Sequence, residues 1–199
     1  MNANPYAPPT AIVADVLPED EVAVDPPFFE VGLPKLAVMS ICTFSLYQLY
    51  WFYQHWKRIA ARERGAISPV ARTIFSVVFC YPCFARIRDY DGSDDGSLSL
   101  LAQRDFPADA PQVGWTLPAV PLTIGWTVMN LGGWVVPDPY TLLTLLDVVF
   151  LLPVQAYANR LNAISKRPHH RNTQLTVWNW VGVAVGGLLL LTALLAPES

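Results

Sequence analysis

The sequence predicts an all-α integral membrane protein, with a bundle of four transmembrane helices, one short re-entrant or interfacial helix and a disordered N-terminal tail. Hydrophobic residues make up 53% of the 199 residues and charged residues only 15%, whereas soluble domains carry about 25% charged residues. Residues 36–54 contain no charged side chain, and a helix of this length can cross a hydrocarbon core of about 30 Å. An aromatic run leading into basic residues follows at 50–58, as is typical of a membrane–water interface.

Residues 1–34 are predicted to form an acidic, Pro-rich disordered tail. This segment contains neither Lys nor Arg, and its prolines interrupt any apolar periodicity. Such a composition cannot bury enough apolar surface to offset the entropy of ordering. Residues 28–31 are expected to rest at the interface before the first helix. The helical membrane domain then occupies residues 35–197.

Four apolar segments of this domain are predicted to span the membrane, at about 36–55, 113–136, 140–157 and 175–195. A tight turn near residue 137 joins the second and third of them into a helical hairpin. The apolar segment 73–85 is shorter, lies between Arg72 and Arg86 and contains Pro82. Runs of this length more often lie in the interface, re-enter or pack in a core than span.

The distribution of Lys and Arg favours one topology. Basic residues cluster at 57–72 and 160–171, and such clusters flank spans on the cytoplasmic side. If 73–85 does not cross, every Lys and Arg other than Lys35 faces the cytoplasm, and both termini lie outside. The alternative has five spans with the N-terminus inside, and it places the two basic clusters on opposite sides.

Asp147 is the one acidic residue in the middle of a predicted span. A carboxylate in the bilayer is costly, so such residues face the bundle interior and are often functional. Three interpretations stay open for Asp147. It joins helices by hydrogen bonds to Thr144 or Asn130, it carries an ion or a proton, or it lies near enough to an interface to be solvated.

Cys80 and Cys83 form a Cys-Tyr-Pro-Cys sequence. In thiol oxidoreductases this spacing lowers a thiol pKa and lets two sulfurs join in a small ring. A relay of that kind normally uses a second cysteine pair, and only Cys42 remains in this chain. The alternative is that both are small apolar residues of an embedded segment.

The last predicted span carries a small-xxx-small pattern, which allows helices to approach closely in lipid. Its partner is either another helix of the chain or a second copy. The pattern consists of Gly182, Gly186 and Gly187. Aromatic and basic residues that flank the spans are expected to anchor them at the interface. These predicted anchors are Tyr50, Trp51, Tyr53, Trp56, Lys57, Trp178 and Trp180.

The sequence Tyr-Trp-Phe-Tyr at 50–53, with Trp56 and Lys57, is followed by Pro69 and Arg72. These residues resemble a family of uncharacterised bacterial multi-pass inner-membrane proteins, which carry a similar YWFYxxWK run and then a Pro-x-x-Arg segment. Asn-rich positions before the last helix are matched by Asn159, Asn162 and Asn179. The resemblance covers about residues 28–195. It implies residence in a bacterial inner membrane and no catalytic residues.

The sequence therefore favours a small, non-enzymatic membrane protein with a structural, assembly or envelope and signalling role. It contains no phosphate-binding loop, nucleophile elbow or metal-ligating pattern, and we expect no cofactor, no metal and no nucleic-acid partner. The expected partners are the lipid bilayer and a second copy or another membrane protein. Two alternatives stay open: a transporter or channel component that uses Asp147, and a membrane thiol oxidoreductase at Cys80 and Cys83.

Overall fold

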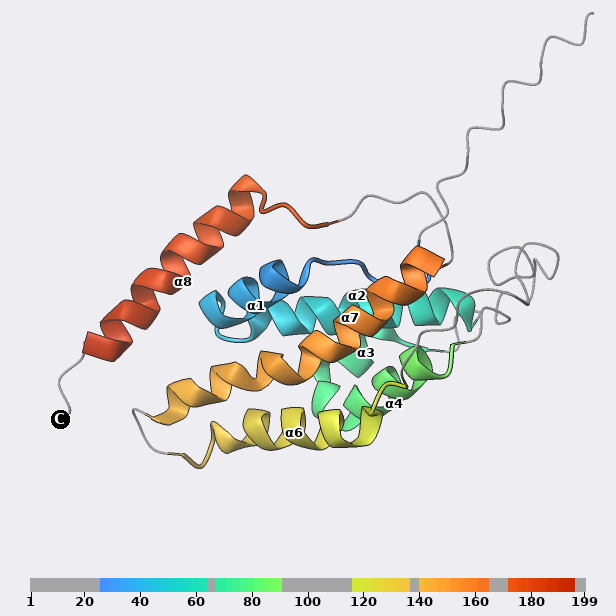
Figure 1. Cartoon of the computed structure of the whole chain (residues 1–199). Helices are drawn as coiled ribbons and strands as arrows, with labels where there is room; N and C mark the ends of the chain where they lie inside the picture. The colour runs from blue at the N-terminus through green and yellow to red at the C-terminus, as the bar shows by residue number, and fades with distance from the viewer. Residues whose placement is uncertain (1–25, 64–66, 91–115, 137–139, 165–171, 196–199) are drawn as a thin grey trace, which may run out of the picture.

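The computed structural model describes residues 26–63, 67–90, 116–136, 140–164 and 172–195, and every regular element in these ranges is a helix (Figure 1). The predicted all-α fold is therefore confirmed. In chain order the elements are α1 (Leu33–Cys42), α2 (Leu46–Arg62), α3 (Pro69–Ile74), α4 (Ser76–Arg88), α6 (Ala119–Gly132), the 3₁₀ helix η1 (Tyr140–Asp147), α7 (Val148–Ile164) and α8 (Val177–Leu195).

The uncharged stretch 36–54 does not form one helix, so the predicted span at 36–55 is wrong. The chain turns back between α1 and α2, where Phe44 and Ser45 take left-handed conformations with φ of 50° and 64° (Figure 1). The Thr43 hydroxyl donates to Met39 O at 2.6 Å and accepts from Tyr47 N at 2.9 Å. These bonds satisfy backbone groups at the break, as the ends of two short helices require. The result is an α1–α2 hairpin.

The segment 73–85, predicted to be one short embedded helix, is divided between α3 and α4 by a break at Phe75. The Ser68 hydroxyl accepts a hydrogen bond from Ala71 N at 3.4 Å and Pro69 occupies the first helical turn, a typical helix start. Pro82 lies inside α4. Neither helix is long enough to cross a hydrocarbon core, which agrees with the expectation that this region does not span.

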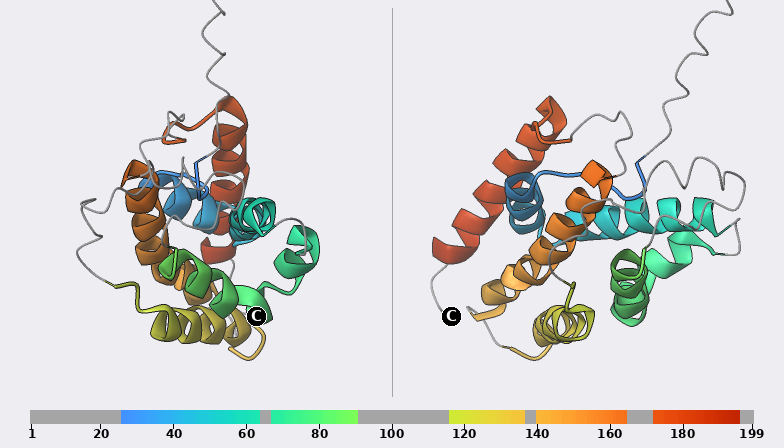
Figure 2. Two further views of the ribbon diagram at one scale, coloured as in Figure 1. Left: turned by 90° about the vertical axis from the view of Figure 1, so that its right-hand side faces the viewer. Right: turned by 45° about the vertical axis from the view of Figure 1, so that its right-hand side comes forward.

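The helix α6 and the continuous η1–α7 unit run side by side in opposite directions (Figures 1 and 2). This arrangement confirms the predicted helical hairpin. Gly125 permits the close approach, because a Cβ there would overlap the ring of Phe150. The η1–α7 unit is longer than the predicted segment 140–157 and continues to Ile164.

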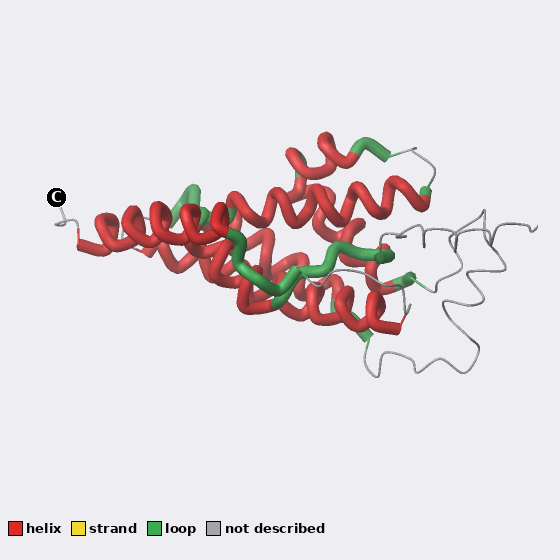
Figure 3. The backbone as a smooth tube through the Cα atoms, turned by 90° about the horizontal axis from the view of Figure 1, so that it is seen from above, coloured by secondary structure: helices red, strands yellow, loops and turns green. Residues whose placement is uncertain are grey.

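The helix α8 lies outermost on its side of the molecule, and its C-terminal end projects beyond the other helices (Figures 1 and 3). It packs against α1, and Gly186 is its buried residue. A Cβ on Gly186 would overlap the carbonyl oxygen of Cys42. The helices therefore touch backbone to backbone at this glycine, as small-residue patterns allow.

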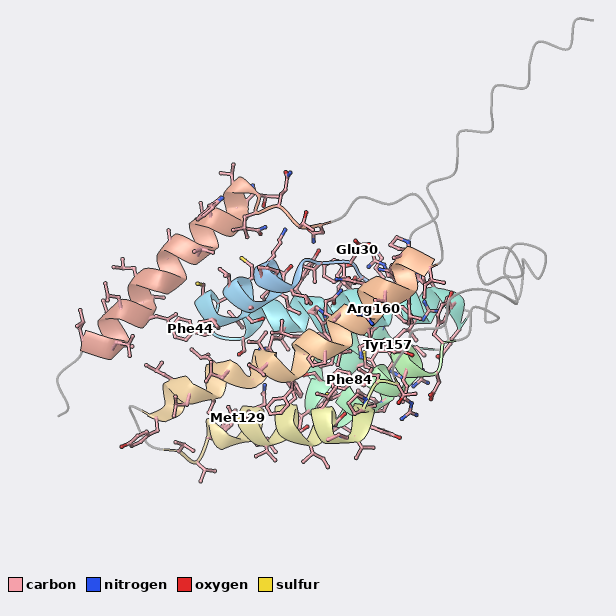
Figure 4. All side chains as sticks on the ribbon, viewed as in Figure 1. Glu30, Phe44, Phe84, Met129, Tyr157 and Arg160 are labelled. Carbon is pink, nitrogen blue, oxygen red and sulfur yellow. The ribbon has the colours of Figure 1, made fainter. Side chains whose placement is uncertain are left out.

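The two ends of the molecule differ in charge. The α2, α4 and α7 helices all finish at one end, which we call the basic end (Figure 1). The turn of the α1–α2 hairpin, the turn after α6 and the C-terminal end of α8 lie toward the other end, which we call the apolar end. Figure 4 places Arg160 and Tyr157 toward the basic end and Phe44 and Met129 toward the apolar end.

Two helices in the described ranges are long and apolar enough to cross a membrane: Leu142–Ile164 and Val177–Leu195. The predicted bundle of four spanning helices is not supported, because the first predicted span is a hairpin and α6 has only 14 residues. At a rise of about 1.5 Å per residue, α6 covers roughly 21 Å. What the structure supports is an all-helical fold with two candidate spanning helices.

The contact between α8 and α1 leads to a prediction. The Gly186→Ala variant should destabilise the protein by about 1–3 kcal/mol, because the added methyl group meets a backbone carbonyl that cannot rotate away. Thermal unfolding in detergent measures this loss. Gly187→Ala is the matched control, since a Cβ there meets nothing within 4 Å. Equal stability of the two variants would show that α8 does not pack on α1 through Gly186.

Candidate functional site

A first polar cluster surrounds Asp147, at the junction between η1 and α7. Its carboxylate accepts hydrogen bonds from Gln48 Nε2 at 2.5 Å and Asn130 Nδ2 at 3.0 Å. The Ser45 hydroxyl lies 3.3 Å from Oδ2, and the Asp147 residue is only 1% exposed. Gln48 Oε1 in turn accepts from Trp126 Nε1 at 2.7 Å. We call these five side chains the Asp147 cluster.

The Asp147 cluster joins three elements that are distant in the sequence. Ser45 and Gln48 come from the tip of the α1–α2 hairpin, Asn130 and Trp126 from α6, and Asp147 from the end of η1. The hydrogen bond to Asn130 that the sequence suggested is confirmed. Asp147 lines neither the cleft beside Arg62 and Arg86 nor the cleft beside Lys35. The geometry is that of a carboxylate that holds helices together.

A second polar cluster surrounds Gln155, on the same face of α7 two turns further on. Gln155 Oε1 accepts from Trp51 Nε1 at 2.5 Å and lies 3.3 Å from His55 Nε2. Its Nε2 donates to Asn159 Oδ1 at 2.6 Å and to Phe29 O at 2.9 Å. Because each atom of the Gln155 amide has two partners, this side chain is saturated in a site that is 0% exposed.

His55 is held as a neutral imidazole at the side of this cluster. Burial lowers its pKa to about 3, the positive charges of Arg58 and Arg62 add to that effect, and the bond to Gln155 opposes it. The Gln155 oxygen requires the proton on Nε2, so the other nitrogen, Nδ1, is unprotonated. Nδ1 has no hydrogen-bond partner in the part of the chain that the structure describes.

The extended segment 26–32 docks along α7 through side-chain amides. Asn162 Nδ2 donates to Phe28 O and Asn162 Oδ1 accepts from Phe28 N, both at 3.0 Å. Asn159 Nδ2 donates to Val31 O at 2.9 Å. Phe28 and Val31 are 0% exposed. The predicted disordered tail 1–34 is therefore wrong for its last residues, whereas 1–25 lie outside the described residues.

Arginines stack on aromatic rings at the basic end. The Arg62 guanidinium lies 4.5 Å from the Phe28 ring centroid and 4.7 Å from that of Tyr90, and it also donates to Pro27 O. The Arg72 and Arg86 guanidiniums lie over the Trp56 ring at 4.4 and 5.5 Å. Arg86 Nε forms an ion pair with Glu63 at 2.6 Å. Such contacts fix both the segment 26–32 and the ends of α2 and α4.

The predicted interfacial anchors divide into two groups. Trp51 and Trp56 are 0% exposed and belong to the core, so their assignment as interfacial anchors is wrong. Tyr50, Trp178 and Trp180 are 45%, 82% and 60% exposed, as an interfacial position requires. Lys57 is exposed and Tyr53 is half-buried.

Cys80 and Cys83 are buried in α4 and form no disulfide with each other. Burial raises the pKa of the Cys80 thiol to about 12 and raises that of Cys83 as well. A reactive cysteine needs solvent access and a lowered pKa, and neither thiol has these properties. The two side chains instead pack in the core with Phe84 and Ile87.

The predicted helix-packing glycines fall into two groups, those that contact α1 and one that does not. Gly186 is buried on α1, and a Cβ on Gly182 would lie 3.8 Å from Cε of Met39 on the same helix. Gly187 faces open space. The partner of Gly182 and Gly186 is thus an internal helix, which was one of the two options.

Sequence reasoning missed the residues that complete the two polar clusters, in particular Gln48, Gln155 and Trp126. A signal was available in the spacing of Gln155, Asn159 and Asn162, which places three amides on one face of a helix. On α2, Gln48 and His55 are similarly two turns apart. Neither pattern identifies its partner helix, so the pairing itself emerges only from the structure.

Comparison of the chain with protein-family models, with curated proteins and with solved structures gave no match. The resemblance to a bacterial inner-membrane family stays a prediction.

The Asp147 cluster predicts a large effect of removing its acceptor. Asp147→Ala should destabilise the protein by about 2–4 kcal/mol, because the buried donors of Gln48 and Asn130 lose their partner. Asp147→Asn should cost less, because one acceptor oxygen remains. Thermal unfolding in detergent measures both. Asp89→Ala is the control, since the Asp89 side chain is 61% exposed; a loss as large as that of Asp147→Ala would contradict this role.

The neutral His55 predicts acid lability. The unfolded chain binds a proton at this residue below its ordinary pKa of 6.5, whereas the folded protein does so only near 3. Stability should therefore fall as the pH is lowered from 6.5, by about 2 kcal/mol at pH 5. Unfolding in detergent at a series of pH values measures the slope. His55→Gln removes this titration and should flatten the curve; an unchanged slope would show that His55 is not buried neutral.

Proposed function

We propose that this chain is an integral membrane protein with a non-enzymatic structural or assembly role. The observation that carries the proposal is the distribution of polarity. Polar side chains such as Asp147, Gln48 and Gln155 are buried and have hydrogen-bond partners inside the protein, whereas large apolar side chains of α8 face outward. A soluble protein rarely exposes an apolar surface of this extent. A hydrocarbon solvent favours this arrangement, because every buried polar group must find a partner inside.

The proposed placement has the basic end in the cytoplasm and the apolar end toward the other side. The η1–α7 unit and α8 cross, and α6 accompanies α7 as a shorter passage. The α1–α2 hairpin enters the membrane and returns, because α1 has only 10 residues and covers roughly 15 Å. In this placement Trp178 and Trp180 mark the interface at the start of α8.

This orientation differs from the predicted topology with both termini outside. Pro27 and Phe28 contact Arg62 at the basic end, so the described chain begins on the cytoplasmic side. The helix α8 then ends on the opposite side. The N-terminal side is thus the same as in the five-span alternative, which has the N-terminus inside, although fewer than five segments cross.

The non-enzymatic role is supported by how the interior polar groups are used. The amide of Gln155 has all its partners within the protein, and Asp147 is fixed by donors from two other elements. An intramembrane carboxylate of a transporter would face a water-filled path, and a thiol oxidoreductase would expose a reactive sulfur. We assign residence in a bacterial inner membrane on the sequence resemblance alone.

Membrane extraction tests the placement. The full chain expressed in bacterial cells should stay in the membrane pellet after treatment with alkaline carbonate, because the apolar surface of α8 requires a lipid environment. Release into the soluble fraction would rule out an integral membrane protein.

Orientation is tested with single cysteines in a chain that carries Cys42→Ser, Cys80→Ala and Cys83→Ala. A cysteine at Ala61, an exposed residue near the basic end, should react with a membrane-impermeant maleimide only after the cells are opened. A cysteine at Trp134, which is 88% exposed at the opposite end, should react in intact cells. The reverse pattern would invert the proposed orientation.

A further inference from the structure

A cleft of about 360 Å³ lies between the α1–α2 hairpin and the N-terminal end of α8. It is separate from the Asp147 and Gln155 clusters. Its walls come from three segments of the chain that are far apart in the sequence: 35–39, 47–50 and 172–179. The lining residues are Lys35, Met39, Tyr47, Tyr50, Asn172, Thr176 and Asn179.

Lys35 places an ammonium group in this cleft without a carboxylate beside it. Nζ donates to Asn172 Oδ1 at 2.6 Å and to Gln174 O at 2.7 Å, and the Asn179 amide oxygen, turned toward it, accepts at 2.9 Å. All three acceptors are neutral. Lys35 is only 5% exposed, and none of the described acidic residues lines the cleft. The cleft therefore holds a net positive charge that water reaches poorly, and such a charge attracts an anion.

The other polar groups of the cleft are hydrogen-bond donors that are still available. The phenol hydroxyls of Tyr47 and Tyr50 have no hydrogen-bond partner among the residues that the structure describes, and their rings lie 5.6 Å apart. Asn172 uses its oxygen for Lys35, and its Nδ2 group donates to none of the described residues. Thr176 Oγ1 accepts from Asn179 N at 3.4 Å, and its hydroxyl proton likewise has no acceptor in the described ranges. Donors grouped around a buried cation are what an oxyanion requires.

We propose that this cleft binds a phosphate-bearing anion. The phosphate oxygens accept from the tyrosine hydroxyls and the Asn172 amide, while Lys35 supplies the compensating charge from behind. Burial lowers the pKa of Lys35, and a bound anion offsets that cost. The source is a phospholipid headgroup or free phosphate. The exposed apolar face of α8 continues from the cleft, so the acyl chains of a lipid have a surface to lie on.

The lipid source rests on the proposed membrane placement, whereas the phosphate site itself does not. Two probes separate the sources. Inorganic phosphate is titrated into the full chain in a phosphate-free nonionic detergent, and phosphatidylglycerol is titrated in the same detergent. The midpoint of thermal unfolding reports binding in each case, since a ligand that binds the folded state raises it.

The variant Lys35→Met should weaken binding by about tenfold or more, because it removes the charge of the one ionised side chain among the described residues that line the cleft. Lys57→Met is the matched control, an exposed lysine on α2 outside the cleft, and it should bind as the wild type does. Where Lys35→Met does not fold, the double variant Tyr47→Phe, Tyr50→Phe keeps the rings and removes two donors, and it should show the same direction of change.

A Lys35-dependent rise with phosphatidylglycerol alone identifies the lipid as the ligand, and a rise with inorganic phosphate identifies the free anion. No saturable rise with either probe would overturn the proposal, as would binding that neither Lys35→Met nor the tyrosine double variant weakens. If the protein is released by carbonate but still binds phosphate through Lys35, the membrane placement fails and the anion site stands.

Discussion

The hydrogen bonds between the tip of the α1–α2 hairpin and Asp147 are the interaction on which the rest of the structure depends. Gln48 and Ser45 reach Asp147 from the point where the chain turns back. That anchor helps to offset the left-handed conformations of Phe44 and Ser45, which cost roughly 1–2 kcal/mol per residue. The same carboxylate binds Asn130 and so fixes α6 against α7. One buried acidic group thus sets both the depth of the hairpin and the register of its neighbours.

How far the sequence could predict this fold depends on which signals are local. The all-helical class follows from composition, the α6–α7 hairpin from the turn near residue 137, and the Gly186 contact from the spacing of small residues. The break at 43–45 has no Gly or Pro to mark it, so a helix that continues to residue 55 was the expected outcome. The side chains of Ser45 and Gln48 at this break are hydrogen-bonded to Asp147, about a hundred residues away. Tertiary contacts of this kind override local propensity, and a single sequence does not contain them in readable form.

The same difference between local signals and tertiary contacts decides which site residues the sequence could predict. Asp147 and its bond to Asn130 were foreseen, because a carboxylate in an apolar segment requires a donor. Trp51 and Trp56 were misassigned, because an aromatic residue beside a basic one has the same local pattern at an interface and in a core. The topology predicted from the sequence places Lys35 alone among the basic residues outside the cytoplasm. In the structure it is buried. Two of its neutral acceptors, on Asn172 and Gln174, lie on the segment that leads into α8, and the third, on Asn179, lies in the first turn of α8.

The hairpins also resolve the distribution of positive charge. Five crossings would place the two basic clusters on opposite sides of the membrane. The predicted four-span topology satisfies the positive-inside rule by placing both termini outside. In the proposed placement, the α1–α2 hairpin enters the membrane and returns, and neither arrangement is needed. The hairpin brings Arg58 and Arg62 back to the side where segment 26–32 begins. At that end the guanidiniums are stacked on aromatic rings, and an arginine suits such a position because its planar, weakly hydrated group tolerates contact with a ring. Lysine has a compact and strongly hydrated charge. Among the lysines in the described ranges, Lys35 is the buried one, and oxygen atoms surround its ammonium group. The two kinds of cation therefore have different tasks: the arginines hold the basic end together, and Lys35 leaves its charge unbalanced in a cleft lined with donors.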